Sequence, residues 1–194
     1  LELGGKSPFI VFDDADLDSA ANAQVSGIFA ATGQSCVAGS RLLVQRSAKE
    51  AFLARLKAKA EAVAIGLPDQ MTTEVGPLCT ARQRARIVDL IARSVTAGAV
   101  VVTGGVAPEG PGFYFPPTIL DCSDAPDAPC LQEEFFGPVL SVVTFDTEDQ
   151  ALAMANDTAY GLASGVFTRS LTRAHRMIRG IRAGVVWVNT YRAV

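Results

Sequence analysis

Residues 8–45, PFIVFDDADLDSAANAQVSGIFAATGQSCVAGSRLLVQ, contain two short apolar runs on either side of an amphipathic segment. The runs PFIVF and RLLVQ are too short and too apolar for solvated strands, so both are expected to be covered on both faces of a sheet. Between them, Asp16 or Asp18 can cap a helix that runs to about Thr32. A strand, a helix and a strand in this order predict a parallel βαβ unit.

The same alternation continues through the rest of the chain. Further apolar runs predict strands at 99–103, 139–145, 163–167 and 184–188, which are likewise expected to be covered on both faces. Amphipathic patterns predict helices after a cap at Ser47, over 84–97, over 147–157 and over 171–180. The sequence therefore predicts a three-layer α/β/α domain with a mostly parallel sheet, formed as a single domain over residues 1–194.

Two of these helices have a defined apolar stripe in the sequence. In the helix after Ser47 the stripe consists of Phe52, Leu56, Ala60 and Val63. In the helix over 84–97 it consists of Ile87, Leu90, Ile91 and Val95. Both stripes are expected to pack on the sheet, and Gly98 is expected to end the second helix.

The composition is that of a globular domain that acts on small molecules. Of the 194 residues 49% are hydrophobic, and 20 acidic side chains outnumber 17 basic ones. This slightly acidic balance argues against nucleic acid or an anionic membrane as a partner. No apolar run approaches the roughly 20 residues that span a bilayer, and no basic-then-apolar leader opens the chain. We therefore expect a soluble, cytoplasmic protein.

The four cysteines show no metal-binding or disulfide pattern. They are too sparse for a disulfide framework and form no CxxC pair, so reduced thiols are expected. His175, the one histidine, lies in an Arg-rich helical stretch, so no metal site is predicted. Cys79, Cys122 and Cys130 have no chemically suggestive neighbours in the sequence and are interpreted as structural.

Three unusual segments each precede a predicted strand: LELGGKSP before the first, GQSCVAGS before the second and QEEFFGP before the strand at 139–145. Loops that precede parallel strands emerge at one edge of the sheet, so Glu2, Cys36 and Glu134 are expected to face one another. Ligands usually bind at the opposite edge, outside the carboxyl ends of the strands. A site at this edge makes sense if a second domain closes over it.

The residue types at this edge suit attack on a carbonyl group. A cysteine thiolate such as that of Cys36 adds to carbonyl carbon, and flexible glycines let backbone N–H groups approach the developing oxyanion. Glu2 could activate a water that cleaves a thioester. Phe135 and Phe136 beside Glu134 offer an apolar face next to a hydrogen-bond acceptor. Each feature alone also fits simple packing or a solvated turn, and the residues by themselves leave both interpretations open.

The segments LELGGKSP, GQSCVAGSR, EEFFGPV, NDTAYGLAS and GVVWVN resemble, in order and spacing, signature segments of the aldehyde dehydrogenase superfamily. The resemblance covers essentially the whole chain and corresponds to the catalytic domain of that family. It implies that a nucleotide-binding domain and a C-terminal oligomerisation segment lie outside this chain.

The resemblance also implies a role for each matching residue. Cys36 corresponds to the nucleophile, which forms a thiohemiacetal with an aldehyde and then a thioester. Glu2 corresponds to the general base that activates the hydrolytic water. Glu134 corresponds to the residue that hydrogen-bonds the nicotinamide ribose, and Phe136 to the ring beside the nicotinamide. Asn156 and its neighbours in NDTAYGLAS are expected to fix the turn behind the site.

The resemblance implies NAD or NADP as the cofactor, a small-molecule aldehyde as the substrate and a homo-oligomeric assembly. The presence of Glu2 favours acid-forming members over those that transfer the acyl group to coenzyme A. Two alternatives remain for the chain by itself: residual thiol esterase activity, which needs no cofactor, or an inactive fragment that self-associates through apolar surface.

Overall fold

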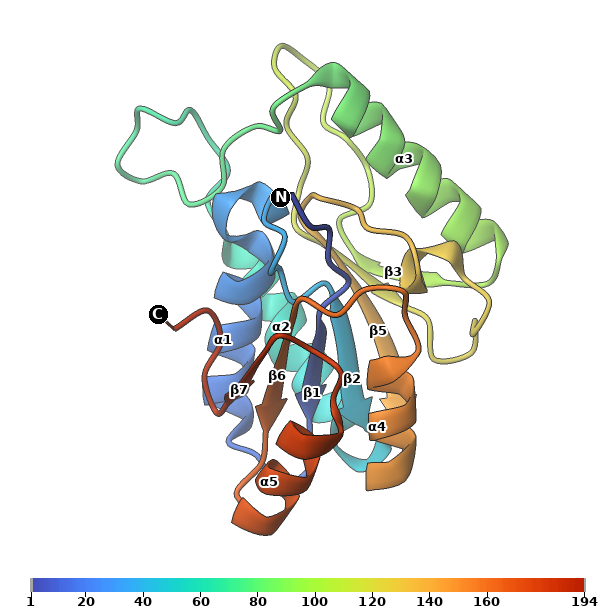
Figure 1. Cartoon of the computed structure of the whole chain (residues 1–194). Helices are drawn as coiled ribbons and strands as arrows, with labels where there is room; N and C mark the ends of the chain where they lie inside the picture. Colours follow the sequence, from blue (N-terminus) through green and yellow to red (C-terminus); the bar gives the residue numbers. More distant parts are fainter. Residues whose placement is uncertain (1, 194) are drawn as a thin grey trace.

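The computed structural model describes residues 2–193, which form one seven-stranded sheet flanked by helices (Figure 1). The strands are β1 (Pro8–Val11), β2 (Arg41–Gln45), β3 (Val100–Thr103), β4 (Thr118–Asp121), β5 (Val139–Phe145), β6 (Ala163–Phe167) and β7 (Val185–Val188). The α-helices are α1 (Leu17–Phe29), α2 (Lys49–Ala62), α3 (Ala81–Thr96), α4 (Glu148–Asn156) and α5 (Leu171–Gly180). Short 3₁₀ turns are η1 (Ala30–Gly33), η2 (Arg46–Ala48) and η3 (Pro129–Leu131).

The strand order in the sheet is β3-β4-β5-β2-β1-β6-β7, and every neighbouring pair is parallel except the antiparallel pair β3–β4. The predicted mostly parallel α/β/α sheet is therefore confirmed. The three strands that follow the unusual loops, β5, β2 and β1, are neighbours at its centre. Their amino ends consequently lie side by side at one edge.

Alternate residues of the central strands enter two separate cores. Phe9 and Val11 of β1 pack with α1 and α2 on one face, whereas Ile10 packs with α3 and α5 on the other. Period-two alternation explains this division, because successive side chains of a strand point to opposite faces. Figure 1 shows the same layers, with α1 and α2 on one side of the sheet and α4 and α5 on the other.

The strand predictions locate both edge strands, β3 and β7, but they miss β4 and overestimate the burial of the two edges. The strand β4 was missed because its four residues follow a Pro- and Gly-rich stretch that indicates only a loop. The edge strands β3 and β7 are partly exposed, with Val100 63% and Val185 46% exposed, so the prediction that they are covered on both faces is wrong. Only the inner strands have neighbours on both sides.

The helix α1 starts as predicted and ends early. Asp16 caps it by accepting from the Ser19 N–H at 3.0 Å. It stops at Phe29 instead of Thr32, because Ala31 and Thr32 adopt left-handed backbone angles in η1. The chain therefore turns sharply just before the Cys36 segment.

Three other predicted helix details are wrong. Ser47 does not cap α2, because its hydroxyl donates to Asp13 Oδ2 at 2.8 Å and the 3₁₀ turn η2 intervenes. The helix α3 begins at Ala81 after the cap Thr80, three residues before the predicted start. In the stripe of α3, Val95 is exposed while Ser94 is buried.

The segments 147–157 and 171–180 form helices as predicted, and Thr147 caps α4 with a complete capping box. Within residues 2–193, none of the helices combines the length and apolar character needed to cross a bilayer.

Candidate active site

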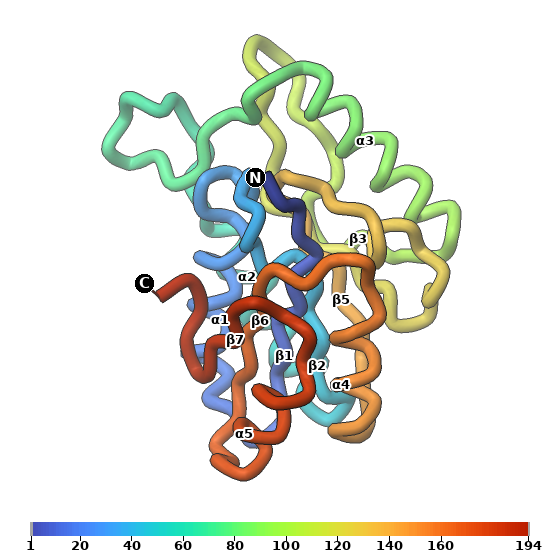
Figure 2. Tube along the Cα trace, in the orientation of Figure 1, coloured from blue at the N-terminus to red at the C-terminus, as the bar shows by residue number. Residues whose placement is uncertain are grey.

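The opening segment, the Cys36 loop and the segment before β5 meet at the amino ends of the central strands. Figure 2 shows the N-terminal segment running between the other two at this end of the sheet. The contact point is Gly5, whose N–H donates to Glu134 Oε1 at 2.9 Å. A Cβ added at Gly5 would overlap the carbonyl oxygen of Cys36. The structure thus brings Cys36 and Glu134 to the two sides of one glycine.

Gly4 extends this contact to the second oxygen of the Glu134 carboxylate. A Cβ built on Gly4 would lie 2.8 Å from Glu134 Oε2 and 3.0 Å from the Tyr160 ring. Neither Gly4 nor Gly5 could carry a side chain without displacing a neighbour. Glycine is required here for close approach of the backbone to its partners.

Cys36 lies in a turn whose backbone is fixed by hydrogen bonds. The Ala38 N–H donates to Ser35 O at 3.0 Å and closes the turn. Gln24 Nε2 donates to Gly39 O at 2.7 Å in the buried layer beneath it. The Cys36 side chain is exposed, whereas Ala38 and Gly39 are buried. The turn therefore presents the thiol on a fixed support.

The backbone leading into this turn is strained. Ala31, Thr32 and Gly33 have φ angles of 54°, 57° and 65°, and left-handed angles are costly for residues with a Cβ. Thr32 Oγ1 donates to Gly76 O at 3.2 Å, and a Cβ on Gly33 would overlap the backbone of Gly137. Contacts with two distant loops thus maintain the reversal between α1 and the Cys36 turn.

In the segment before β5, the side chains of two adjacent glutamates point in different directions. Glu133 forms a two-pronged ion pair with Arg93 of α3, at 2.8 and 3.0 Å, and the Arg93 guanidinium lowers the pKa of Glu133. Glu134 turns the other way, toward Gly4 and Gly5. Only Glu134 therefore reaches the edge that holds Cys36.

The two phenylalanines of the same segment also point apart. Phe135 is 1% exposed and belongs to the core, whereas Phe136 is 39% exposed and has a left-handed φ of 50°. Gln83 Nε2 donates to both of their carbonyl oxygens, at 2.5 and 2.9 Å. This bridge from α3 fixes the backbone that leaves the Phe136 ring at the surface.

Glu2 is placed less tightly than the other predicted site residues. It is exposed at the start of the described chain, three residues before Gly5. Across residues 2–193, no hydrogen bond joins the Glu2 carboxylate to the Cys36 turn. The structure therefore puts Glu2 on the segment that contacts the Cys36 turn, without fixing its side chain at the thiol.

Tyr191 supports the Cys36 turn and was missed in the sequence. Its hydroxyl donates to Val37 O at 2.9 Å, and its ring lies against Gly39 and Gly165, where a Cβ would approach within 3.2 and 2.5 Å. Burial raises the pKa of the Tyr191 phenol. No local motif marks this residue, because its partners are more than 20 residues away.

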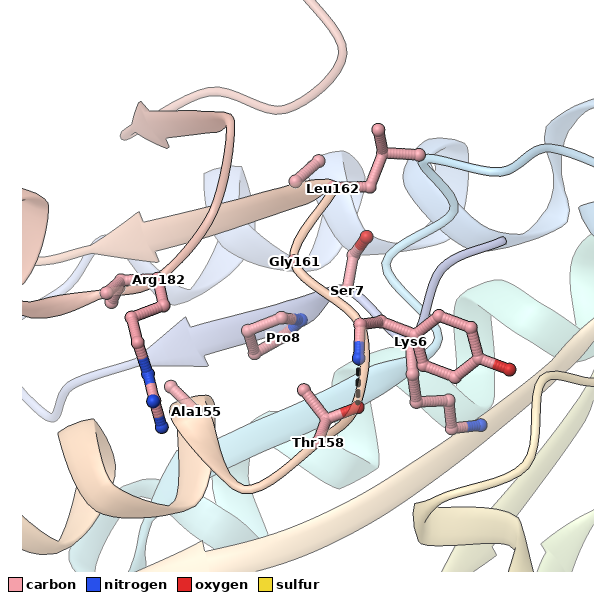
Figure 3. Close-up of a pocket in the computed structure, with 11 residues that line it drawn as sticks. Lys6, Ser7, Pro8, Ala155, Thr158, Gly161, Leu162 and Arg182 are labelled. Atoms are coloured by element: carbon pink, nitrogen blue, oxygen red, sulfur yellow. Dashed lines mark hydrogen bonds between the residues drawn. The ribbon is translucent and has the colours of Figure 1, made fainter. Parts of the chain in front are cut away.

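Lys6 is the second residue that sequence reasoning missed. It is 1% exposed, and Figure 3 shows its side chain leaving the backbone on the side opposite to that of Ser7.

In the NDTAYGLAS segment, the Asn156 side chain donates to Gly180 O at 2.9 Å and accepts from the Arg182 N–H at 2.7 Å. Asn156 thus ties this turn to the end of α5, as expected of a structural residue.

Cys122 and Cys130, interpreted as structural residues, are both buried, and the structure also brings them into contact with each other. Their sulfur atoms lie 3.3 Å apart in the buried layer. Eight residues separate them in the sequence, and only the fold of the intervening loop brings them together.

A family model described as the aldehyde dehydrogenase family matches residues 1–194, the whole chain. The chain belongs to the aldehyde dehydrogenase family. This confirms the resemblance carried by the five sequence segments, and the three-layer fold is the fold of the aldehyde dehydrogenase structures that it matches.

One curated relative is (Z)-2-((N-methylformamido)methylene)-5-hydroxybutyrolactone dehydrogenase of Acinetobacter baylyi. The chain is 62% identical to it over 194 residues, which cover 100% of this chain and 40% of that protein. It is 46% identical to betaine aldehyde dehydrogenase of Rhizobium johnstonii, covering 98% of this chain and 40% of the relative. The chain thus spans about 40% of the length of these relatives.

Solved structures match the whole chain closely. PnpE in complex with nicotinamide adenine dinucleotide has a TM-score of 0.96 and 42% identity, over 100% of this chain and 40% of that structure. Lactaldehyde dehydrogenase from Escherichia coli has a TM-score of 0.96 and 41% identity, over 100% and 41%. A nicotinamide cofactor therefore accompanies this domain type in a structural relative.

Proposed function

We propose that this chain is the catalytic domain of an NAD(P)-dependent aldehyde dehydrogenase that oxidises a small aldehyde to a carboxylic acid. Cys36 is the nucleophile, Glu2 the general base, and Glu134 with Phe136 the cofactor-binding pair. Residues 1–194 act as one domain, and further domains of the parent protein complete the cleft. The observation that carries the proposal is the convergence of Cys36 and Glu134 on Gly5 beneath an exposed thiol.

The chain's own residues account for bond making at the substrate carbonyl. The Cys36 thiolate adds to the aldehyde carbon and forms a thiohemiacetal, while the Cys36 N–H donates to the oxyanion. After oxidation the acyl group remains on the sulfur as a thioester. Glu2 then takes a proton from a water molecule, and the resulting hydroxide cleaves the thioester to release the acid. The exposed position of Glu2 gives its carboxylate the freedom to approach and leave the sulfur.

The residues at this edge fit a nicotinamide dinucleotide. Glu134 uses one oxygen for the Gly5 N–H, so it keeps acceptor capacity for a ribose hydroxyl, and the exposed Phe136 ring offers an apolar face. When bound, the cofactor supplies the acceptor for the two electrons that leave the substrate carbon. Glu134 and Phe136 would orient it, and the Gln83 bridge would keep both residues in place.

Kinetics of the full-length protein test the nucleophile. Cys36→Ser is expected to lower kcat/KM for aldehydes by about 10³-fold or more, because a hydroxyl is a much weaker nucleophile than a thiolate. Cys79→Ser is the matched control, since Cys79 is also exposed, and it should retain activity within about twofold. Normal turnover by the Cys36→Ser protein would refute the assignment.

The base is tested separately in the first turnover. Glu2→Gln is expected to give a rapid burst of reduced cofactor close to one equivalent per site, followed by slow turnover, because thioester hydrolysis then limits the rate. Mass spectrometry should find the acyl group on the peptide that contains Cys36. If the variant lost both the burst and the steady-state rate, Glu2 would act in a step before thioester hydrolysis.

A further inference from the structure

The buried sulfur pair is held in contact by its backbone. Cys122 directly follows β4, and its N–H donates to Val142 O of β5 at 2.7 Å. Cys130 lies in η3, where its N–H donates to Ser94 Oγ at 3.2 Å and its carbonyl accepts from Ser141 Oγ at 3.0 Å. The 3.3 Å between the sulfur atoms is about 1.3 Å longer than a disulfide bond. A small local shift is enough to join them.

A buried cation accompanies the pair. The Lys6 side chain is 1% exposed, and within the described residues its Nζ has no hydrogen-bond partner. The ammonium lies over the Phe135 ring at 4.8 Å from the centroid. Desolvation lowers the pKa of Lys6 to about 8; the charges of Cys130, Cys122 and Glu134 oppose this fall, and the charge of Arg41 adds to it. A negative charge on one of the thiols would therefore offset part of the desolvation cost of this buried ammonium.

The two thiols share a proton when one of them ionises. The S–H of Cys122 can donate to the Cys130 sulfur, which lowers the pKa of Cys130 and raises that of Cys122. With the Lys6 ammonium nearby, the pair can hold one negative charge in the interior. A thiolate is the form of cysteine that oxidants attack.

A cavity of about 200 Å³ has Cys122 in its wall, together with Arg41, Gln132 and Asp157. Its size and polar lining admit a molecule little larger than water and able to form hydrogen bonds. Cys122 is consequently accessible to a small hydroperoxide although its surface exposure is only 1%.

We propose that Cys122 and Cys130 form a redox modification site at which a small hydroperoxide converts the two thiols into a disulfide. This inference is independent of the proposed dehydrogenase function. The product would tie η3, which leads into Glu134, to the end of β4.

The reaction balances with the groups present and the peroxide. The Cys122 sulfur attacks a peroxide oxygen as its proton passes to the Cys130 thiolate, the O–O bond breaks, and the leaving hydroxide takes a proton from the Lys6 ammonium to form water. The Cys130 sulfur then attacks the Cys122 sulfenic acid, the S–O bond breaks, and the shared proton leaves with the hydroxide as a second water. The two thiols are oxidised by two electrons, and the peroxide is reduced.

Peptide mapping of the full-length protein after treatment with hydrogen peroxide tests the site. Free thiols are blocked with N-ethylmaleimide during denaturation, and the protein is cleaved without reduction on the amino side of aspartates. Asp124 and Asp127 lie between the two cysteines, so the disulfide links two separate peptides. We expect a linked pair containing Cys122 and Cys130, two hydrogens lighter than the free peptides. Recovery of both as blocked thiols, under conditions that oxidise Cys36 or Cys79, would overturn the proposal.

Variants distinguish this site from accidental oxidation. Cys79→Ser should leave the yield of the linked pair unchanged, and Cys122→Ser should abolish it. Lys6→Met removes the cation with little change in volume, and it should slow disulfide formation about tenfold or more. Linkage of Cys122 to any other cysteine, or an unchanged rate in Lys6→Met, would contradict the proposed chemistry.

Discussion

Cys36 and the Cys122–Cys130 pair show two ways in which one fold treats a thiol. Cys36 is exposed, and its surroundings are mainly backbone: a closed turn, the left-handed run at residues 31–33, and Gly5 against its carbonyl. Cys122 and Cys130 are buried, and side chains surround them: each other and the buried Lys6. The comparison teaches that backbone geometry sets the access of the first thiol, whereas burial and charge set the chemistry of the pair.

The largest expected difference is in reaction with a bulky thiol reagent. In the native full-length protein, N-ethylmaleimide should modify Cys36 at least about 10³-fold faster than Cys130, because Cys130 is 0% exposed and reacts only when its surroundings open. The measurement is mass spectrometry of each cysteine peptide over time. In denaturant the modification rates of Cys36 and Cys130 should become similar. Native rates within tenfold of each other would show that the two thiols do not differ in access.

The next effect concerns the backbone contact at the Cys36 turn. Gly5→Ala is expected to destabilise the protein by about 3 kcal/mol or more, because the added Cβ overlaps the Cys36 carbonyl oxygen and neither backbone can yield easily. Gly76→Ala is the matched control, since no atom lies within 4 Å of a Cβ built there. Equal unfolding midpoints in urea for both variants would show that the contact does not constrain the turn.

A smaller effect, with a defined pH dependence, is expected at Lys6. The pKa of Lys6 falls from 10.5 in the unfolded chain to about 8 in the fold, because burial disfavours the ammonium. Between these values the unfolded chain binds more protons, so the Lys6 contribution to stability rises with pH. Below pH 8 the full cost of about 3 kcal/mol is present. Lys6→Met should therefore be at least as stable as the wild type at neutral pH.

The test is the pH dependence of the stability gap between Lys6→Met and the wild type. That gap should change by about 2 to 3 kcal/mol in favour of the wild type between roughly pH 7 and pH 10, as measured by urea unfolding. Lys57→Met, which removes a lysine that is half exposed, controls for the loss of a surface charge. A gap that is constant with pH would show that Lys6 is not a buried cation.

Much of this arrangement could be predicted from local patterns. The inner strands at 41–45, 139–145 and 163–167 have the predicted bounds, because their continuous apolar runs have no alternative to burial on both faces. Asp16 caps α1 through a hydrogen bond that spans only three residues. The order of these elements also predicted that the loops before β1, β2 and β5 share an edge.

The supporting residues of the candidate site could not be predicted in this way. Tyr191 reaches Val37 across 154 residues, and Gln83 reaches the Phe136 carbonyl across 53. Lys6 looks like an ordinary polar residue before a strand, and only packing against Phe135 makes it a buried cation. Such contacts depend on where distant segments meet, and no spacing within a segment encodes them.

The sequence by itself determined the parallel sheet, the family and the residues expected to perform chemistry, because periodicity, caps and short motifs are local properties of the chain. Only the tertiary structure decided which distant residues support the Cys36 turn, which cysteines are in contact and which lysine lies inside. Those outcomes depend on backbone direction and desolvation, which arise when segments far apart in the sequence pack together.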